Sequence, residues 1–151
     1  MDDADPFDLA RFMRAQQPDY DRALAELRAG SKRTHWMWYI FPQLAGLGRS
    51  TMAQRYAISG LPEAQAYLRH DVLGPRLIEC ATVVRDTDGR TAHEIFDAPD
   101  DLKLRSSATL FAQVSPAPVF AQLLQKYFNG QADAETLRLL PRAPTSAAVA
   151  P

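Results

Sequence analysis

Apolar residues recur three or four positions apart in several stretches of the chain, which is the spacing of one face of an α-helix. The clearest stretches are residues 20–27, 73–84, 104–111 and 119–128. Alternation of apolar and polar residues, which would indicate a half-buried strand, does not extend over a useful length. The pattern therefore predicts an all-α fold, a compact single-domain array of about nine or ten short helices.

Residues with special backbone or side-chain roles indicate where some of these helices begin and end. Gly30 follows the first stretch and suits a left-handed C-terminal cap. Thr51 with Gln54, and Thr91 with Glu94, have the spacing of capping boxes. We therefore expect helices to begin immediately after the two threonines.

The run HWMWYIF, residues 35–41, is compatible with either a helix or a strand. Aromatic and branched residues favour a strand, whereas successive apolar residues can also form a helix that is buried on all sides. In a partly exposed helix, some of these side chains would face the core and others would line a groove. Pro42 disfavours a helical conformation at Phe41 and precedes Gln43, whose amide can both donate and accept hydrogen bonds.

Length and composition limit the domain organisation. The 151 residues suffice for one domain, and folding at this size buries about two-thirds of the unfolded surface. We expect a flexible N-terminus at 1–5, a single helical domain at 6–140 and a disordered tail at 141–151, where PRAPTSAAVAP lacks periodicity. The single cysteine, Cys80, excludes an internal disulfide, and with three scattered histidines it forms no zinc pattern. Neither a metal nor a cofactor is predicted.

The sequence also predicts where the protein resides. The start, MDDADPFD, is acidic, whereas a signal peptide is basic and then apolar. The apolar run WMWYIF is six residues long, well short of the ~20 that a membrane span needs. We therefore expect a soluble, cytoplasmic protein that does not bind membranes, and we make no prediction of its oligomeric state.

The formal net charge of −1 conceals an uneven distribution of charge along the chain. Residues 27–62 contain five Lys or Arg and no Asp or Glu, so this segment carries +5 and the remainder −6. The aromatic run lies in the same segment. An anion-binding surface and ordinary solvated basic residues both explain this pattern.

The sequence GLGRST, residues 46–51, combines a glycine turn with an expected helix start. Backbone N–H groups of the turn, the positive helix end and Arg49 could together hold a phosphate. It is not a Walker loop, which needs glycine in place of Gln43 and lysine in place of Arg49. It also lacks the third glycine of a dinucleotide fingerprint. A flexible turn followed by an N-cap is the alternative interpretation.

A second group of polar residues follows Asp100 and Asp101, whose charges suit the positive end of a helix. Lys103, Ser106 and Ser107 then share one face of that helix. A lysine with a pKa lowered by burial could activate a serine, or the three side chains could bind phosphate oxygens. Alternatively, they form a solvent face whose hydroxyls bond back to the helix.

Two of the histidines lead to different expectations. His35 lies beside two tryptophans and two cationic residues, so it could donate to an anion, transfer a proton or play a structural role. His70 is expected at a helix end, where a protonated imidazole suits the dipole, and we interpret it as structural. Asp71 can then serve as the N-cap of the next helix.

Several segments of the sequence resemble those of a known protein family. The segments HWMWYIFPQLAGLGRS, AYLRH, LGPRLIE and DDLKLRSSATLFA look like those of the domain of unknown function 1810 family, whose bacterial members are often labelled calpastatin. The resemblance extends over about residues 6–140 and implies a compact, mostly helical domain, without an established activity. The calpastatin label does not suit this composition, because the protease inhibitor of that name is a disordered chain.

We therefore expect one basic and aromatic pocket that binds a small anionic ligand, nucleotide-like or phosphate-bearing, with catalysis left open. The residues expected to bind it are Lys32, Arg33, Trp36, Trp38, Gln43, Gly46, Gly48, Arg49, Ser50 and Ser107. The candidates for a catalytic role are His35, Lys103 and Ser106. The alternative is a protein-interaction module with an exposed aromatic patch. Direct nucleic-acid binding ranks third because the overall charge is slightly negative.

Overall fold

The computed structural model of the protein describes residues 4–141. These residues form ten helices: α1 (Ala10–Gln16), α2 (Tyr20–Arg28), α3 (Met37–Ile40), α4 (Thr51–Arg55), α5 (Leu61–Arg69), α6 (Leu73–Asp86), α7 (Ala92–Phe96), α8 (Asp100–Ala112), α9 (Val119–Phe128) and α10 (Ala134–Leu139). The part of the chain that is described contains no β-strand, only an isolated parallel bridge between Leu44 and Ile58. The predicted all-α class is therefore confirmed.

The expected terminal segments lie largely outside the described residues. This holds for 1–3 of the N-terminal segment and for 142–151 of the predicted tail. Within the N-terminal segment, the Asp5 carboxylate accepts hydrogen bonds from the backbone N–H groups of Leu9 and Ala10, at 2.8 and 2.9 Å. Asp5 thus contributes to the start of α1. None of the helices between residues 4 and 141 has the length and apolar character needed to cross a membrane.

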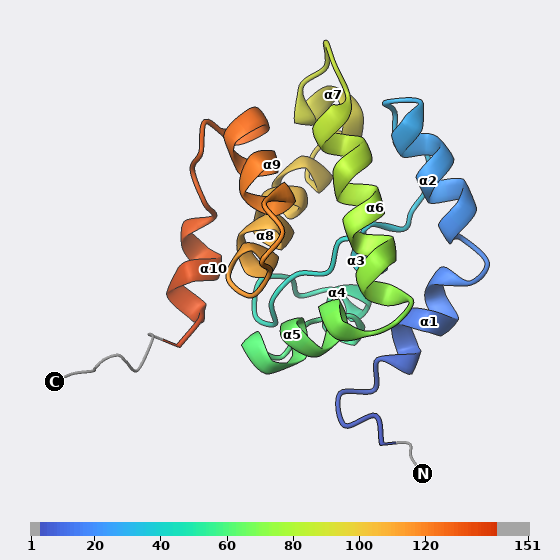
Figure 1. The fold of residues 1–151 in the computed structure, drawn as a ribbon, viewed down its shortest axis with the longest axis vertical. Helices are drawn as coiled ribbons and strands as arrows, with labels where there is room; N and C mark the ends of the chain where they lie inside the picture. Colours follow the sequence, from blue (N-terminus) through green and yellow to red (C-terminus); the bar gives the residue numbers. More distant parts are fainter. Residues whose placement is uncertain (1–3, 142–151) are drawn as a thin grey trace, which may run out of the picture.

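Helix α6 runs lengthwise through the molecule, with α1 and α2 on one side and α8, α9 and α10 on the other (Figure 1). It packs directly on α2, α5 and α9. Helix α8 packs on α5, α7, α9 and α10. Together, α6 and α8 bring most of the core side chains into one continuous apolar cluster.

The apolar stripes predict the buried faces of most helices correctly. In α6, Leu73, Leu77, Cys80 and Val84 are all buried. In α2, Tyr20, Ala23, Leu24 and Leu27 are buried as well. Burying such a stripe provides most of the stability of short helices, which are marginal in isolation.

The buried face of α8 is wider than its apolar stripe predicts. From Leu104 to Phe111, every residue except the half-buried Arg105 is buried. Ser106 and Ser107 therefore lie inside the protein and not on a solvent face. Helices on several sides cover α8, so a single polar face is not available to it.

Two of the three predicted helix-end signals are correct. Gly30 has a left-handed φ of 71°, and Thr91 forms a complete capping box with Glu94. The box predicted for Thr51 is wrong, because Ser50 is the N-cap and its hydroxyl accepts the Ala53 N–H at 3.0 Å. Either hydroxyl residue could have filled this position, and Ser50 is the one with an extended backbone.

The ambiguous run 35–41 forms a single helical turn, α3, and not a strand. Phe41 leaves the helical conformation, with φ −123° and ψ 76°, as a residue before proline is expected to do. Five of the six apolar residues in the run are buried, and Trp38 alone is partly exposed. The run therefore belongs mainly to the core, and Trp38 is the side chain that remains accessible to solvent.

The expectation that His70 lies at a helix end with a structural role is confirmed, because His70 is the C-cap of α5, whereas the expected N-cap role of Asp71 is wrong. The His70 Nδ1 atom accepts hydrogen bonds from the backbone N–H groups of Val72 and Leu73, at 3.1 and 3.2 Å. The His70 side chain thus supports the start of α6 as a hydrogen-bond acceptor. Asp71 is exposed and is not the N-cap of α6, which is Val72.

Candidate functional site

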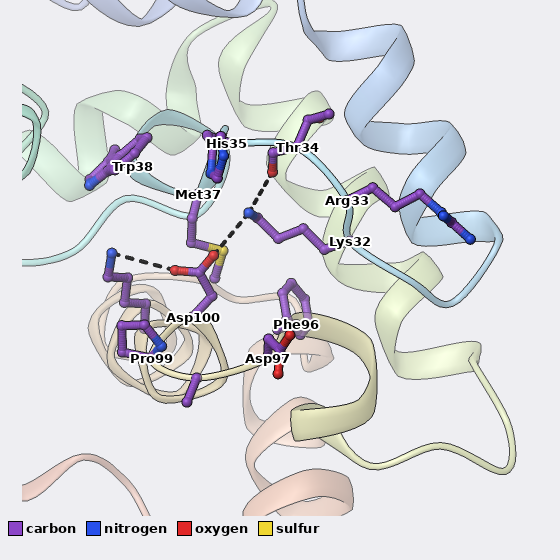
Figure 2. A pocket seen from close by; sticks show the side chains of 12 residues that line it. Lys32, Arg33, Thr34, His35, Met37, Trp38, Phe96, Asp97, Pro99 and Asp100 are labelled. Carbon is purple, nitrogen blue, oxygen red and sulfur yellow. Dashed lines mark hydrogen bonds and ion pairs between the residues drawn. The ribbon is translucent and has the colours of Figure 1, made fainter.

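A cavity of about 390 Å³ lies between the segment 32–38 and the segment 96–103. The first segment is the loop before α3 together with the start of that helix, and the second joins α7 to α8. Figure 2 shows Lys32 and Asp100 extending toward each other from these two segments. The cavity therefore brings together residues more than sixty positions apart in the sequence.

The loop at 33–36 is held in place by one buried carboxylate, that of Glu26 on α2. Its Oε1 atom accepts hydrogen bonds from the backbone N–H groups of Arg33 and Thr34 and from the Trp36 indole, at 2.8, 3.0 and 2.9 Å. Its Oε2 atom accepts the Thr34 hydroxyl at 2.7 Å. Burial opposes ionisation of Glu26, but these hydrogen bonds outweigh it and lower the pKa to about 2.

Two lysines meet the same carboxylate inside the cavity. The Lys32 Nζ atom lies 2.9 Å from Asp100 Oδ2, and the Lys103 Nζ atom lies 3.4 Å from Asp100 Oδ1. Lys32 also donates to the Thr34 carbonyl at 2.5 Å, and its side chain is only 6% exposed, against 23% for Lys103. Lys32 is therefore a fixed part of the cavity, whereas Lys103 keeps contact with solvent.

The two tryptophans of the chain lie under different lysines. The Lys32 ammonium is 4.9 Å from the centre of the Trp36 ring, and the Lys103 ammonium is 5.2 Å from the centre of the Trp38 ring. Both distances are typical of a cation–π interaction. Trp36 is fully buried and does not line the cavity, whereas the partly exposed Trp38 does. Of the two tryptophans, therefore, Trp38 is the one that offers an aromatic surface to the cavity.

The opposite wall of the cavity contains an unusual backbone conformation. Asp97 has φ 63° and ψ 168°, a region that is normally restricted to glycine. Its backbone N–H bonds to the His93 carbonyl at 2.8 Å, and its carbonyl accepts the Asp101 N–H at 2.9 Å. Non-glycine residues held in such conformations cluster at functional sites.

The remaining predicted residues of this region lie at the edge of the cavity. His35 and Arg33 both line it and are both exposed. In Figure 2 the Arg33 side chain points away from Lys32 and Asp100, toward α2. Of the candidate catalytic residues, His35 and Lys103 line the cavity.

The glycine turn that was expected to complete the site does not line the cavity. This applies to Gln43, Gly46, Gly48, Arg49 and Ser50. The Ser50 hydroxyl caps the five-residue helix α4, and Arg49 is exposed. This segment forms a turn followed by an N-cap, in line with the alternative interpretation.

The two serines of α8 do not line the cavity either. Ser106 Oγ donates to the Leu102 carbonyl at 3.2 Å, the back-bonding expected for a helical serine. Ser107 Oγ is fully buried and has no hydrogen-bond partner among the described residues. The proposed face of one lysine and two hydroxyls is therefore divided, with Lys103 in the cavity and the serines in the interior.

Sequence reasoning did not assign Glu26, Phe96, Asp97 or Asp100 to the site. Asp100 was noted only for its charge at the start of a helix. No local pattern marks a carboxylate that will pair with a lysine from another segment. The segment 27–62 contains no acidic residue, but in the folded protein two carboxylates from other segments contact it. Asp100 pairs with Lys32, and Glu26 accepts a hydrogen bond from the Arg33 N–H.

Other kinds of reactive group are limited in the part of the structure that is described. Between residues 4 and 141, no cluster of three or more His, Cys, Asp or Glu side chains is arranged to hold a metal ion. Cys80 is buried, and its burial raises the pKa of the thiol to about 12. It is an inert core residue at neutral pH.

Fold and cavity together define a small all-α protein with a pocket of mixed lysine, carboxylate and aromatic character. A family described as "Protein of unknown function (DUF1810)" matches residues 6–140, and the chain belongs to this family. The chain is similar to the conserved hypothetical protein Rv1873 from Mycobacterium tuberculosis, whose crystal structure is known. The two are 58% identical, with 90% of this chain and 98% of the other covered and a TM-score of 0.89. A search of curated proteins found no match.

Proposed function

We propose that the cavity between residues 32–38 and 96–103 binds a small anionic, nucleotide-like ligand. The observation that carries this proposal is the convergence of Lys32 and Lys103 on Asp100 beside the partly exposed Trp38. Ligand pockets typically combine an apolar wall with a few polar groups that fix orientation. The cavity, at about 390 Å³, falls within the usual size range for small-molecule sites.

Each part of the cavity has a definite role in this proposal. Lys103 provides a cationic group with donors left to offer, because only Asp100 contacts it at ion-pair distance among the described residues. Trp38 offers a flat surface on which a planar group can stack. A reaction in this cavity would use His35 for proton transfer, since it is exposed at the edge.

An interaction module with an exposed aromatic patch has less support. Five of the six apolar residues in the run 36–41 are buried. The large apolar side chains that are exposed among the described residues are Leu102, Leu137 and Leu139, none of them aromatic. We also propose a cytoplasmic location, on the basis of the single, unpaired Cys80.

The proposal predicts a ligand-dependent rise in melting temperature that requires Lys103. Adenosine 5′-monophosphate and sugar phosphates at about 100 times the dissociation constant should stabilise the wild-type protein by about 2.7 kcal/mol. Replacing Lys103 by Gln should abolish most of this response, because it removes the solvent-accessible lysine of the cavity. Differential scanning fluorimetry measures the shift.

The matched control is Arg49→Gln, which removes an exposed cation that lies outside the cavity. Its response should equal that of the wild type. Equal loss of response in both variants would show that general surface charge is responsible. No response in the wild type to any small anion at millimolar concentration, whether a phosphate monoester, a phosphodiester or a carboxylate, would contradict the proposed function.

A further inference from the structure

The charges that line the cavity are nearly balanced, although the segment 27–62 is strongly basic in sequence. Lys32, Arg33 and Lys103 are the cations, and Asp97 and Asp100 are the carboxylates. With His35 neutral, the lining carries one net positive charge. A ligand site for a multiply charged phosphate would be expected to have a larger excess of cations.

Lys32, one of the three cations that line the cavity, is already engaged within the protein. Lys32 is in a buried ion pair with Asp100 at 2.9 Å, bonds to the Thr34 carbonyl and stands over the Trp36 ring. A buried ion pair is costly to separate, because each ion would be left without compensation. Lys32 is therefore not free to neutralise a ligand, and the Asp100 carboxylate remains fixed inside the cavity.

The other cations differ in their position. Arg33 is directed away from the Lys32–Asp100 pair (Figure 2). Lys103 approaches Asp100 less closely, at 3.4 Å, and is more exposed than Lys32. One lysine is thus available for an anion, and that anion will bind next to a negatively charged carboxylate.

We infer that the cavity selects ligands whose anionic group carries a single negative charge, namely a carboxylate or a phosphodiester. This inference rests on the proposed function and narrows it. A phosphomonoester carries a charge of about −1.5 to −2 at neutral pH. Lys103 can compensate one of these charges, and repulsion from Asp100 acts on the second.

Three adenosine compounds that differ only in the anionic group provide the test. They are adenosine 5′-monophosphate, its phosphate methyl ester and adenosine 5′-carboxylate, titrated at about pH 7.5 by isothermal titration calorimetry. The methyl ester and the carboxylate should each bind at least about tenfold more tightly than the monophosphate. Which of these two compounds binds more tightly shows whether the cavity prefers a phosphodiester or a carboxylate.

The outcomes separate this inference from the proposed function. Equal or tighter binding of the monophosphate would overturn the inference and leave the proposed function standing. Failure of all three compounds to bind would overturn both. Tighter binding of either singly charged compound supports the inference.

Asp100→Asn tests whether Asp100 is the group that discriminates. The variant should reduce or reverse the preference for the methyl ester over the monophosphate, because the repelling charge is removed. An unchanged ratio of the two affinities would overturn the assignment to Asp100. If the unpaired Lys32 prevents this variant from folding, the affinity ratio of the wild type still decides the charge preference.

Discussion

At the scale of single residues, buried carboxylates organise the segment that looks free of acids in the sequence. Glu26 and Glu63 are the acids that flank residues 27–62, and both are buried. Glu63 pairs with Arg11 at 2.8 Å and accepts two hydrogen bonds from Ser59. Glu26 holds the loop that leads to the cavity. Through these hydrogen bonds, Glu63 connects the segment to Arg11 of α1, and Glu26 connects it to α2.

Glu26 should make stability dependent on acid pH. Its pKa lies at about 2 in the folded protein against an ordinary value of 4.5. The carboxylate therefore stabilises the fold above about pH 4.5 by about 3 kcal/mol, and this contribution is lost as pH falls toward 2. Between about pH 5.5 and about pH 3, the wild type should lose about 2 kcal/mol more than Glu26→Gln.

Urea denaturation of both proteins across this pH range measures the difference. The Gln variant keeps the size of the side chain and one acceptor, so it isolates the effect of the charge. If the free energy of unfolding changes with pH in the same way in both proteins, the hydrogen bonds to Glu26 do not lower its pKa, and the prediction is wrong. Other carboxylates contribute equally to both profiles and cancel in the comparison.

At the scale of elements, hydrophobic periodicity predicted the helices and their apolar faces well. It predicted the roles of polar side chains on those helices less well. The stripe of α6 is buried as expected, because spacing along one helix is a local property. Ser106 and Ser107 are buried because neighbours from distant parts of the chain surround α8. The sequence of one helix does not contain that information. His70 likewise ends α5, and its side chain also accepts hydrogen bonds from backbone N–H groups at the start of α6.

The corner between α5 and α6 should depend on a glycine. A Cβ atom on Gly74 would lie 2.1 Å from the carbonyl oxygen of Leu68, which is a backbone atom that cannot move away easily. Gly74→Ala should therefore destabilise the protein by about 3 kcal/mol. Chemical denaturation measures this change.

Gly60→Ala is the control for that substitution. Gly60 precedes α5 with extended backbone, and the nearest atom to an added Cβ is Pro62 Cδ at 3.7 Å. Its replacement should change stability by less than about 1 kcal/mol. Comparable losses in the two variants would show that general glycine effects, and not the contact with Leu68, determine the result.

At the scale of the whole molecule, the cavity is formed by segments that the sequence does not associate. The aromatic and basic run and Lys103 were both identified as candidates, and the fold brings them together through Asp100. The turn at 46–51 was identified by the same kind of reasoning, yet it does not line the cavity. Residue type and local spacing indicate which side chains can bind an anion. Only the tertiary arrangement determines which of these side chains lie together in one cavity.

The two tryptophans allow the most direct test of the proposed site. The Trp36 indole is buried and bonded to Glu26 at 2.9 Å, whereas Trp38 is partly exposed and lines the cavity. The two indole N–H resonances can be followed in ¹H–¹⁵N spectra and assigned with Trp38→Phe. Titration with the three adenosine anions should shift the Trp38 resonance in a saturable manner and leave the Trp36 resonance almost unchanged. If none of the three shifts Trp38 at millimolar concentration, the cavity is not the ligand site proposed for this protein.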